Sequence, residues 1–288
     1  MDIMKELLNR ILVALIGIPL GIYIIWYGSW LYLISIVIIA SIALFELHKL
    51  VKTCKMRDFF WINLITLISV LIFTGFITLL DFSIIRPYII TQYSSILLTY
   101  FMVYFVVLLL STLFFSANNR LVTFSVTVGT LFYVILPFVS LIMLRMYDFG
   151  TINYKNSWML ILAYFFSIWI CDTFAYFIGK QWGKHKIAPL VSPKKSWEGG
   201  VAGLIGSIFS FVLFSYIFNI NISIVHQIVL GFIIGLFGQI GDFVESSFKR
   251  DAGLKDTSNM LGKHGGILDR FDSIIFTSPI VLLYLINL

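Results

Sequence analysis

Residues 11–47 read ILVALIGIPLGIYIIWYGSWLYLISIVIIASIALFEL. A helix needs about 20 mostly apolar residues to cross a bilayer, so this stretch is long enough for two spans. Gly28 and Ser29 separate the two runs and predict a tight helical hairpin. The charged stretch 1–10 could begin a signal peptide, but no small-x-small cleavage site follows the first run. We therefore interpret that run as a retained membrane span.

The composition of the whole chain fits a lipid environment. Of its 288 residues, 60% are hydrophobic and 12% are charged, whereas soluble domains carry about 25% charged residues. So few charges could not cover the surface of a soluble protein of this length, which excludes that class. The two cysteines, Cys54 and Cys171, indicate no disulfide framework.

Nine apolar runs predict an all-α, polytopic bundle with about nine transmembrane helices. Their approximate bounds are 11–28, 30–47, 60–80, 94–115, 123–144, 157–179, 201–219, 226–248 and 273–288. We divide the chain into 1–150, with about five spans, and 151–288, with about four spans. In the second part, two long cytosolic loops follow the sixth and eighth spans and are candidates for catalytic groups.

The basic residues predict the topology. With nine alternating spans and a cytosolic N-terminus, only Arg86, Arg145 and Lys155 lie outside, and the other 17 of the 20 Lys and Arg residues lie inside. Cytoplasmic loops of membrane proteins carry such an excess. The inside segment 47–60 contains four of these residues, namely Lys49, Lys52, Lys55 and Arg57. We interpret this segment as a topology-setting loop, with binding of anionic lipid head groups as the alternative.

Acidic residues inside apolar runs are functional candidates, because a charge within a span is costly and usually faces the bundle interior or an aqueous cavity. Asp172 lies in the run WICDTF, and Asp242 and Glu245 lie late in the eighth span. Asp242, Glu245 and Ser246 are spaced i, i+3 and i+4, which places them on one helical face. For Glu245, ion pairing with a nearby basic residue is an equally good interpretation.

Asp269 and Asp272 are three residues apart at the start of the ninth span. If this segment is helical, we expect both carboxylates to point the same way. Carboxylates that converge at a membrane surface form a hard-oxygen site that suits Mg²⁺. The alternative is ion pairing of these acids with Lys249, Arg250 or Arg270.

Two glycine-rich basic loops accompany these acids. They contain GKQWGKHK (179–186) with SPKKSWEGG (192–200), and SSFKR (246–250) with GKHGG (262–266). Glycine allows close backbone approach to a ligand, and Lys and Arg neutralise phosphate oxygens. Together with the acids, the loops predict Mg²⁺-dependent chemistry on a phosphate-rich substrate at the membrane. The glycine motifs typical of soluble nucleotide-binding domains are missing.

Two other classes of function fit parts of this pattern. Acids within spans also mark the ion pathways of transporters, but transporters often carry paired repeats in both halves, and here the polar features lie in the second half. A polyprenol kinase or lipid kinase would use the same metal and phosphate chemistry. Identification of the reaction product separates these alternatives.

Residues 246–272, SSFKRDAGLKDTSNMLGKHGGILDRFD, resemble the signature of the phosphatidate cytidylyltransferase (CDP-diacylglycerol synthase) family. The segments DTFAY (172–176) and SPKKSWEG (192–199) resemble two further segments of that family. The similarity covers roughly the last 120 residues. In the first 150 residues only the pattern of spans is compatible.

The resemblance implies that CTP and phosphatidic acid react to give CDP-diacylglycerol and pyrophosphate, with Mg²⁺ and possible help from a monovalent cation such as K⁺. It also implies a multi-pass protein of a bacterial-type plasma membrane, a homodimer, an active site facing the cytosol, and no nucleic-acid partner. The metal ligands would be Asp242, Asp269 and Asp272, with Asp172 as a further candidate. The other catalytic residues would be Lys249, Arg250 and Lys255. The substrate-binding residues would be Lys194, Lys195, Ser196, Ser246, Asp256, His264, Gly265, Gly266 and Arg270.

Overall fold

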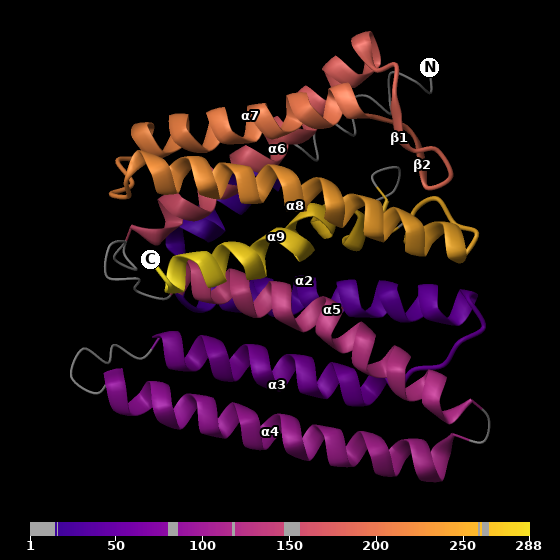
Figure 1. Ribbon diagram of the computed structural model, residues 1–288. Coiled ribbons are helices and arrows are strands. Elements are labelled where there is room, and N and C mark those ends of the chain that lie inside the picture. Colours follow the sequence, from indigo (N-terminus) through magenta and orange to yellow (C-terminus); the bar gives the residue numbers. More distant parts are fainter. Residues whose placement is uncertain are drawn as a thin grey trace.

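The computed structural model describes residues 15, 17–79, 86–116, 119–146, 156–258, 260 and 265–288. After a helix at Gly17–Tyr27, the helices are α2 (Ser29–Thr53), α3 (Phe60–Leu79), α4 (Arg86–Phe115), α5 (Arg120–Met146), α6 (Ser157–Trp182), α7 (Trp197–Ile217), α8 (Ile224–Asp251) and α9 (Leu268–Ile286). Two short strands, β1 (Lys186–Ala188) and β2 (Ser192–Ser196), lie between α6 and α7 (Figure 1). One predicted site residue, His264, lies outside the described residues.

The described residues include seven helices, α2 to α8, that are long and apolar enough to cross a membrane. The two ends of the predicted nine-span series differ from these. The helix Gly17–Tyr27 is shorter, and α9 begins with charged residues that leave it a short apolar part. The chain is a polytopic helical membrane protein, as predicted, and its cytosolic N-terminus stays a prediction.

The predicted hairpin of the first two runs is confirmed, and its turn depends on Gly28. This residue has a φ of +66°, a conformation that side chains with a Cβ rarely adopt. A Cβ at Gly28 would also lie 2.3 Å from Nη2 of Arg145 in α5. The Arg145 guanidinium donates hydrogen bonds to the carbonyl oxygens of Ile25 (2.6 Å) and Trp26 (3.0 Å). This arginine therefore satisfies the carbonyls where the first helix of the hairpin ends.

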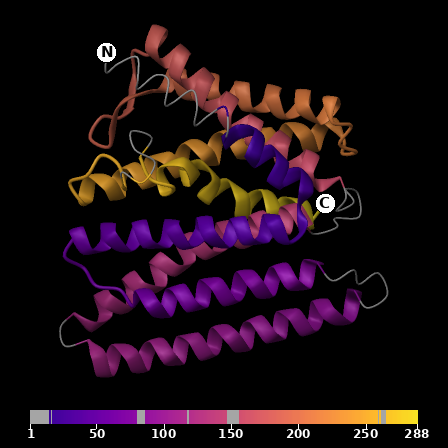
Figure 2. The ribbon, with the colours of Figure 1, turned by 180° about the vertical axis from the view of Figure 1, so that it is seen from behind.

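The helices form one bundle. Helices α3 and α4 lie at one side and α6, α7 and α8 at the other, with α2, α5 and α9 between them (Figures 1 and 2). Helix α5 contacts α2, α3 and α9, so it joins the first half of the chain to the last helix. A continuous apolar core runs through both halves and includes Leu44, Phe138, Tyr164 and Leu285.

Glycines allow the helices of the second half to approach closely, as is common in membrane bundles. A Cβ at Gly199 in α7 would lie 2.7 Å from the carbonyl oxygen of Ala175 in α6. A Cβ at Gly241 in α8 would lie 2.6 Å from the carbonyl oxygen of Asp272 in α9. The contact between α8 and α9 therefore brings together the two helices that carry most of the predicted site.

Basic residues gather at one end of the bundle, on the right in Figure 1, where α2 and α8 end and the β1–β2 hairpin projects. We call this end, which carries Lys49, Lys52, Arg57, Lys194, Lys195, Lys249 and Arg250, the basic end. The hairpin is a feature that the all-helical prediction did not contain. Its antiparallel strands pair Lys186 with Ser196, which satisfies backbone groups of the loop.

Candidate active site

The predicted polar face of α8 divides into two groups. Asp242 accepts a hydrogen bond from Ser246 Oγ (3.2 Å) and forms an ion pair with Lys195, which comes from β2. Glu245 is buried and pairs instead with Lys249, whose Nζ lies 2.7 Å from Oε2. The ion-pair interpretation of Glu245 is thus confirmed. Asp242 and Ser246 lie together, as the helical spacing predicted.

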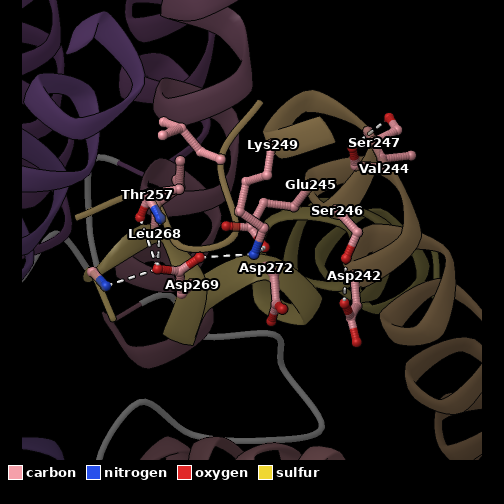
Figure 3. A network of polar contacts seen from close by, with 12 residues as sticks. Asp242, Val244, Glu245, Ser246, Ser247, Lys249, Thr257, Leu268, Asp269 and Asp272 are labelled. Carbon is pink, nitrogen blue, oxygen red and sulfur yellow. Dashed lines mark hydrogen bonds and ion pairs between the residues drawn. The ribbon is translucent and has the colours of Figure 1, made fainter. Parts of the chain in front are cut away.

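Asp269 is fully engaged by protein groups. Its Oδ1 accepts from Lys249 Nζ (2.7 Å), and its Oδ2 accepts from Thr257 N (3.0 Å), Thr257 Oγ1 (2.9 Å) and Gly266 N (2.7 Å). Figure 3 shows its carboxylate turned toward Thr257, whereas Asp272 points away from that loop. The expectation that both carboxylates point the same way is therefore wrong, because Lys249 and the Thr257 loop hold Asp269 on their own side of α9. A role for Asp269 as a metal ligand stays a prediction.

Three other carboxylates converge from three helices. Asp172 in α6, Asp242 in α8 and Asp272 in α9 interact electrostatically with one another. Figure 3 shows that Asp242 and Asp272 point to the same side of the site. Lys195 and Arg270 are the cationic groups that act on Asp172. Like charges this close repel one another unless a cation compensates them.

Two of these carboxylates have oxygens to which no described residue donates a hydrogen bond. Asp272 Oδ1 accepts from its neighbour Ser273 N (2.6 Å), while Oδ2 accepts no hydrogen bond from any described residue. Neither oxygen of Asp172 accepts one within the same residues. Carboxylate oxygens are the donors that Mg²⁺ prefers, so the residues present fit this ion.

The geometry also limits how such an ion is held. Among the described residues, no three His, Cys, Asp or Glu side chains are placed to hold one metal ion. Mg²⁺ is commonly bound by one or two carboxylates together with waters and substrate phosphates. Asp242 and Asp272 suit that arrangement, with Asp172 beside them.

The predicted substrate-binding residues fall into different environments. Lys194, Lys255 and Asp256 are exposed at the basic end. Arg250 donates to the carbonyl oxygens of Val191 (3.3 Å) and Leu254 (3.0 Å), which ties the β1–β2 hairpin to the end of α8. Ser196, in contrast, is buried and caps α7 by accepting from Gly199 N at 3.3 Å, so its observed role is structural.

The glycine pair before α9 serves packing within the protein. Gly265 has a φ of +77°, and a Cβ there would lie 2.6 Å from Asp269 Oδ2. A Cβ at Gly266 would lie 2.3 Å from Thr257 Oγ1 and 2.5 Å from Glu46 Oε2. The sequence pattern predicts that these glycines allow close approach of a ligand. In the structure they let the loop close around two buried carboxylates.

Glu46 in α2 is a residue that the sequence analysis missed. Its side chain is buried and accepts from Ser258 Oγ (2.5 Å), Leu268 N (2.7 Å) and Ile267 N (3.1 Å). It therefore caps the N-terminus of α9 from another helix. A signal for it existed, because Glu46 is an acid inside an apolar run, which is the criterion that identified Asp172.

The fold and the site together define a class, namely multi-helix membrane proteins with converging carboxylates at a basic end. The sequence model of the cytidylyltransferase family matches residues 8–288, and the chain belongs to this family. The family resemblance noted in the sequence is therefore confirmed.

Curated relatives carry a more specific name. The chain is 46% identical over 129 residues to the phosphatidate cytidylyltransferase of Staphylococcus aureus (strain COL), 44% over 128 residues to that of Staphylococcus saprophyticus, and 43% over 128 residues to that of Staphylococcus haemolyticus. Each alignment covers 44% of this chain and 49% of the relative. The chain thus spans about half the length of the curated relatives it matches.

Proposed function

We propose that the protein transfers the cytidylyl group of CTP to phosphatidic acid, giving CDP-diacylglycerol and pyrophosphate. Membership of the cytidylyltransferase family and the names of the staphylococcal relatives support this reaction. The observation that carries it is the convergence of Asp172, Asp242 and Asp272 at the basic end, where Asp172 and Asp272 have oxygens to which no described residue donates.

The reaction makes one bond and breaks another. An oxygen of the lipid phosphate attacks the α-phosphorus of CTP, and the bond from this phosphorus to the β-phosphate oxygen breaks, so that pyrophosphate leaves. The attacking oxygen is already anionic, so neither a nucleophilic side chain nor a general base is required. Because two anions must meet, catalysis consists mainly of positioning and charge neutralisation.

We assign roles to the chain's own residues accordingly. Asp242 and Asp272, with Asp172 beside them, would hold Mg²⁺, which when bound neutralises charge on the triphosphate. Lys195, paired with Asp242, would contact phosphate oxygens. Lys194, Arg250 and Lys255 are exposed at the same end and would attract the nucleotide. Lys249 lies between two acids and is a positioning residue in this scheme.

The proposal includes the placement of the substrates. The basic end would face the cytosol, as the excess of Lys and Arg predicts, in a bacterial plasma membrane. CTP would enter from the water, and phosphatidic acid would enter sideways between helices with its acyl chains still in the bilayer. A homodimer and a monovalent cation beside the Mg²⁺ remain parts of the proposal that rest on the family resemblance.

Product identification tests the proposal. The purified full chain in detergent is incubated with phosphatidic acid, Mg²⁺ and each of CTP, UTP, ATP and GTP, and lipids are identified by mass spectrometry. We expect CDP-diacylglycerol from CTP, with equal release of pyrophosphate. A phosphorylated lipid with release of a nucleoside diphosphate would instead indicate a lipid kinase. Ion flux in proteoliposomes without any nucleotide-dependent product would indicate a transporter.

A further inference from the structure

A pocket of about 390 Å³ lies at the basic end of the first half. Residues from the end of α2, the α2–α3 connection, the start of α3 and the α4–α5 connection line it, among them His48, Lys52, Arg57, Asp58, Phe60 and Ser116. The proposed transfer reaction uses none of these residues. The pocket therefore requires its own explanation.

The floor of the pocket is a buried pair. His48 Nδ1 lies 2.5 Å from Asp58 Oδ1, and the Asp58 side chain is 0% exposed. Because a carboxylate accepts this hydrogen bond, Nδ1 carries the proton and Nε2 is left for another partner. The ring of Phe60 packs on the imidazole, with the centroids 4.6 Å apart. The histidine is thus held in one orientation.

The wall of the pocket is also fixed. Helix α2 ends in a Schellman-type turn, in which Met56 N donates to Val51 O (3.1 Å) and Lys55 adopts a φ of +59°. Phe59 N then donates to Thr127 Oγ1 in α5 at 3.1 Å. These bonds hold Arg57 and Asp58 in place between two helices. The pocket is preformed rather than a gap in a loose loop.

More cationic than anionic side chains line the pocket, namely Lys52 and Arg57 against Asp58. Asp58 is the one acid among the described residues that line the pocket, and its Oδ1 is engaged with His48, while its buried Oδ2 has no hydrogen-bond partner among them. The side chains of Lys52 and Arg57 form no ion pair or hydrogen bond with any described residue. Lysine and arginine side chains without a partner of their own are groups that bind phosphate oxygens.

The surroundings of the pocket are apolar. Trp61 and Phe115 both line it, and they are 71% and 79% exposed. They lie at the ends of the membrane-spanning helices α3 and α4, whose outer residues Ile65 and Phe114 are also exposed. Amphipathic aromatic residues such as Trp favour the membrane interface. A ligand in this pocket therefore has lipid beside it.

We propose that this pocket binds the phosphate head group of an anionic phospholipid, with Lys52 and Arg57 around the phosphate, His48 beside them, and the acyl chains along α3 and α4. The position at the ends of the spans favours a lipid over a soluble phosphate ester. This also assigns a ligand to the basic segment 47–60, for which the sequence analysis preferred a topology-setting role.

The test compares two pairs of lysine or arginine substitutions in the same segment. The full chain in neutral detergent is titrated with phosphatidylglycerol, and bound lipid is measured by native mass spectrometry. Phosphatidylglycerol is used because phosphatidic acid is also the proposed substrate. The pocket variant is Lys52→Gln with Arg57→Gln. The control is Lys49→Gln with Lys55→Gln, which removes the same charge outside the pocket.

We expect the pocket variant to lose about 100-fold in affinity, roughly tenfold for each charged contact, and the control to lose less than about tenfold. Glycerol 3-phosphate should not compete, and phosphatidylcholine should bind at least about tenfold more weakly than phosphatidylglycerol. Equal losses in the two variants would overturn the proposal, because they would show only general attraction to a basic surface. Competition by glycerol 3-phosphate would also overturn it in favour of a soluble phosphate ester.

A second measurement needs no variant and covers the case in which the pocket variant does not fold. A phosphatidylglycerol with a photoreactive diazirine in the head group is cross-linked to the wild-type chain, and the labelled peptides are identified. We expect labelling at residues 48–62. Labelling confined to the β1–β2 hairpin or to the ends of α8 and α9 would contradict the proposal.

Discussion

Acids on the apolar helices of the two halves of the chain have different surroundings. Glu46 in the first half accepts hydrogen bonds at both oxygens, and those donors come from the loop before α9. In the second half, Asp172 and Asp272 leave oxygens without a partner among the described residues. Glu46 therefore has a structural role, whereas Asp172 and Asp272 have oxygens that a ligand can use.

Other polar groups of the first half follow the same pattern. Asn63 in α3 donates to Thr127 O (2.9 Å) and Thr130 Oγ1 (2.8 Å), and it accepts from Tyr104 OH at 3.0 Å. These bonds join α3, α4 and α5 in the apolar interior. Interhelical hydrogen bonds of this kind stabilise membrane bundles. Asn63 and its partners therefore join helices of the first half, whereas Asp172, Asp242 and Asp272 of the second half converge on one another.

The largest effect is expected from removing an acid of the second half. Asp242→Asn and Asp272→Asn should each lower CTP-dependent turnover by at least about 10³-fold, because charge on the triphosphate is no longer neutralised. Turnover is measured on folded, purified protein. Asp251→Asn is the matched control, since Asp251 is an exposed acid at the end of the same helix, and it should change turnover less than about twofold. Wild-type turnover in either test variant would remove that residue from the site.

A large loss of stability is expected when Lys249, the cation shared by Glu245 and Asp269, is removed. Lys249→Met leaves both Glu245 (1% exposed) and Asp269 (6% exposed) without their partner, which should cost about 3–5 kcal/mol of unfolding free energy. The loss is measured by unfolding in a mixed-detergent titration. Lys184→Met, at an exposed lysine, should stay within about 0.5 kcal/mol of the wild type. An equal effect of the two substitutions would disprove the buried pairing.

A smaller loss is expected at the point where the halves meet. Glu46→Gln replaces one acceptor oxygen with a donor, so about two hydrogen bonds are lost at a cost of about 2–4 kcal/mol. Because the loop before α9 is then released, we also expect the KM for CTP to rise. Ser258→Ala removes one of these donors and should cost about 1 kcal/mol. If the Glu46→Gln variant keeps the wild-type stability and KM, Glu46 does not hold the loop before α9 in the way described.

The smallest effect distinguishes two neighbouring lysines. Lys195 pairs with Asp242, whereas Lys194 is exposed. Lys195→Gln should raise the KM for CTP by about tenfold, as expected for loss of one charge-assisted contact. Lys194→Gln should raise it by less than about threefold, as expected for an exposed charge. A larger rise in KM for Lys194→Gln than for Lys195→Gln would indicate that the nucleotide binds on the outer side of the β1–β2 hairpin.

Much of the fold was predictable from the lengths of the apolar runs and the positions of the charged residues along the chain. The hairpin at Gly28, the helices from α2 to α8 and the basic end all follow from apolar runs and loop charge. The β1–β2 hairpin was not predictable in this way. Its strands are three and five residues long, and sequence period is a weak signal over such short segments.

The site was predictable as a set of residues but not as an arrangement. Acids in apolar runs identified Asp172 and Asp242, which do converge with Asp272. Helical spacing could not show that Lys249 and Thr257 hold Asp269 apart, because those contacts depend on how the loop folds back onto α9. Nor could it place Glu46 beside that loop, since the two lie more than 200 positions apart in the chain.

Mn²⁺ binding, measured by electron paramagnetic resonance in the presence of CTP, tests most directly whether the carboxylates of Asp242 and Asp272 hold a divalent ion. We predict that Asp242→Asn and Asp272→Asn each weaken Mn²⁺ binding by at least about tenfold, since even residues behind a metal's ligands affect affinity by about 10–100-fold. Glu46→Gln should change it less. Wild-type Mn²⁺ affinity in both aspartate variants, or a loss seen only with Asp269→Asn, would contradict the account.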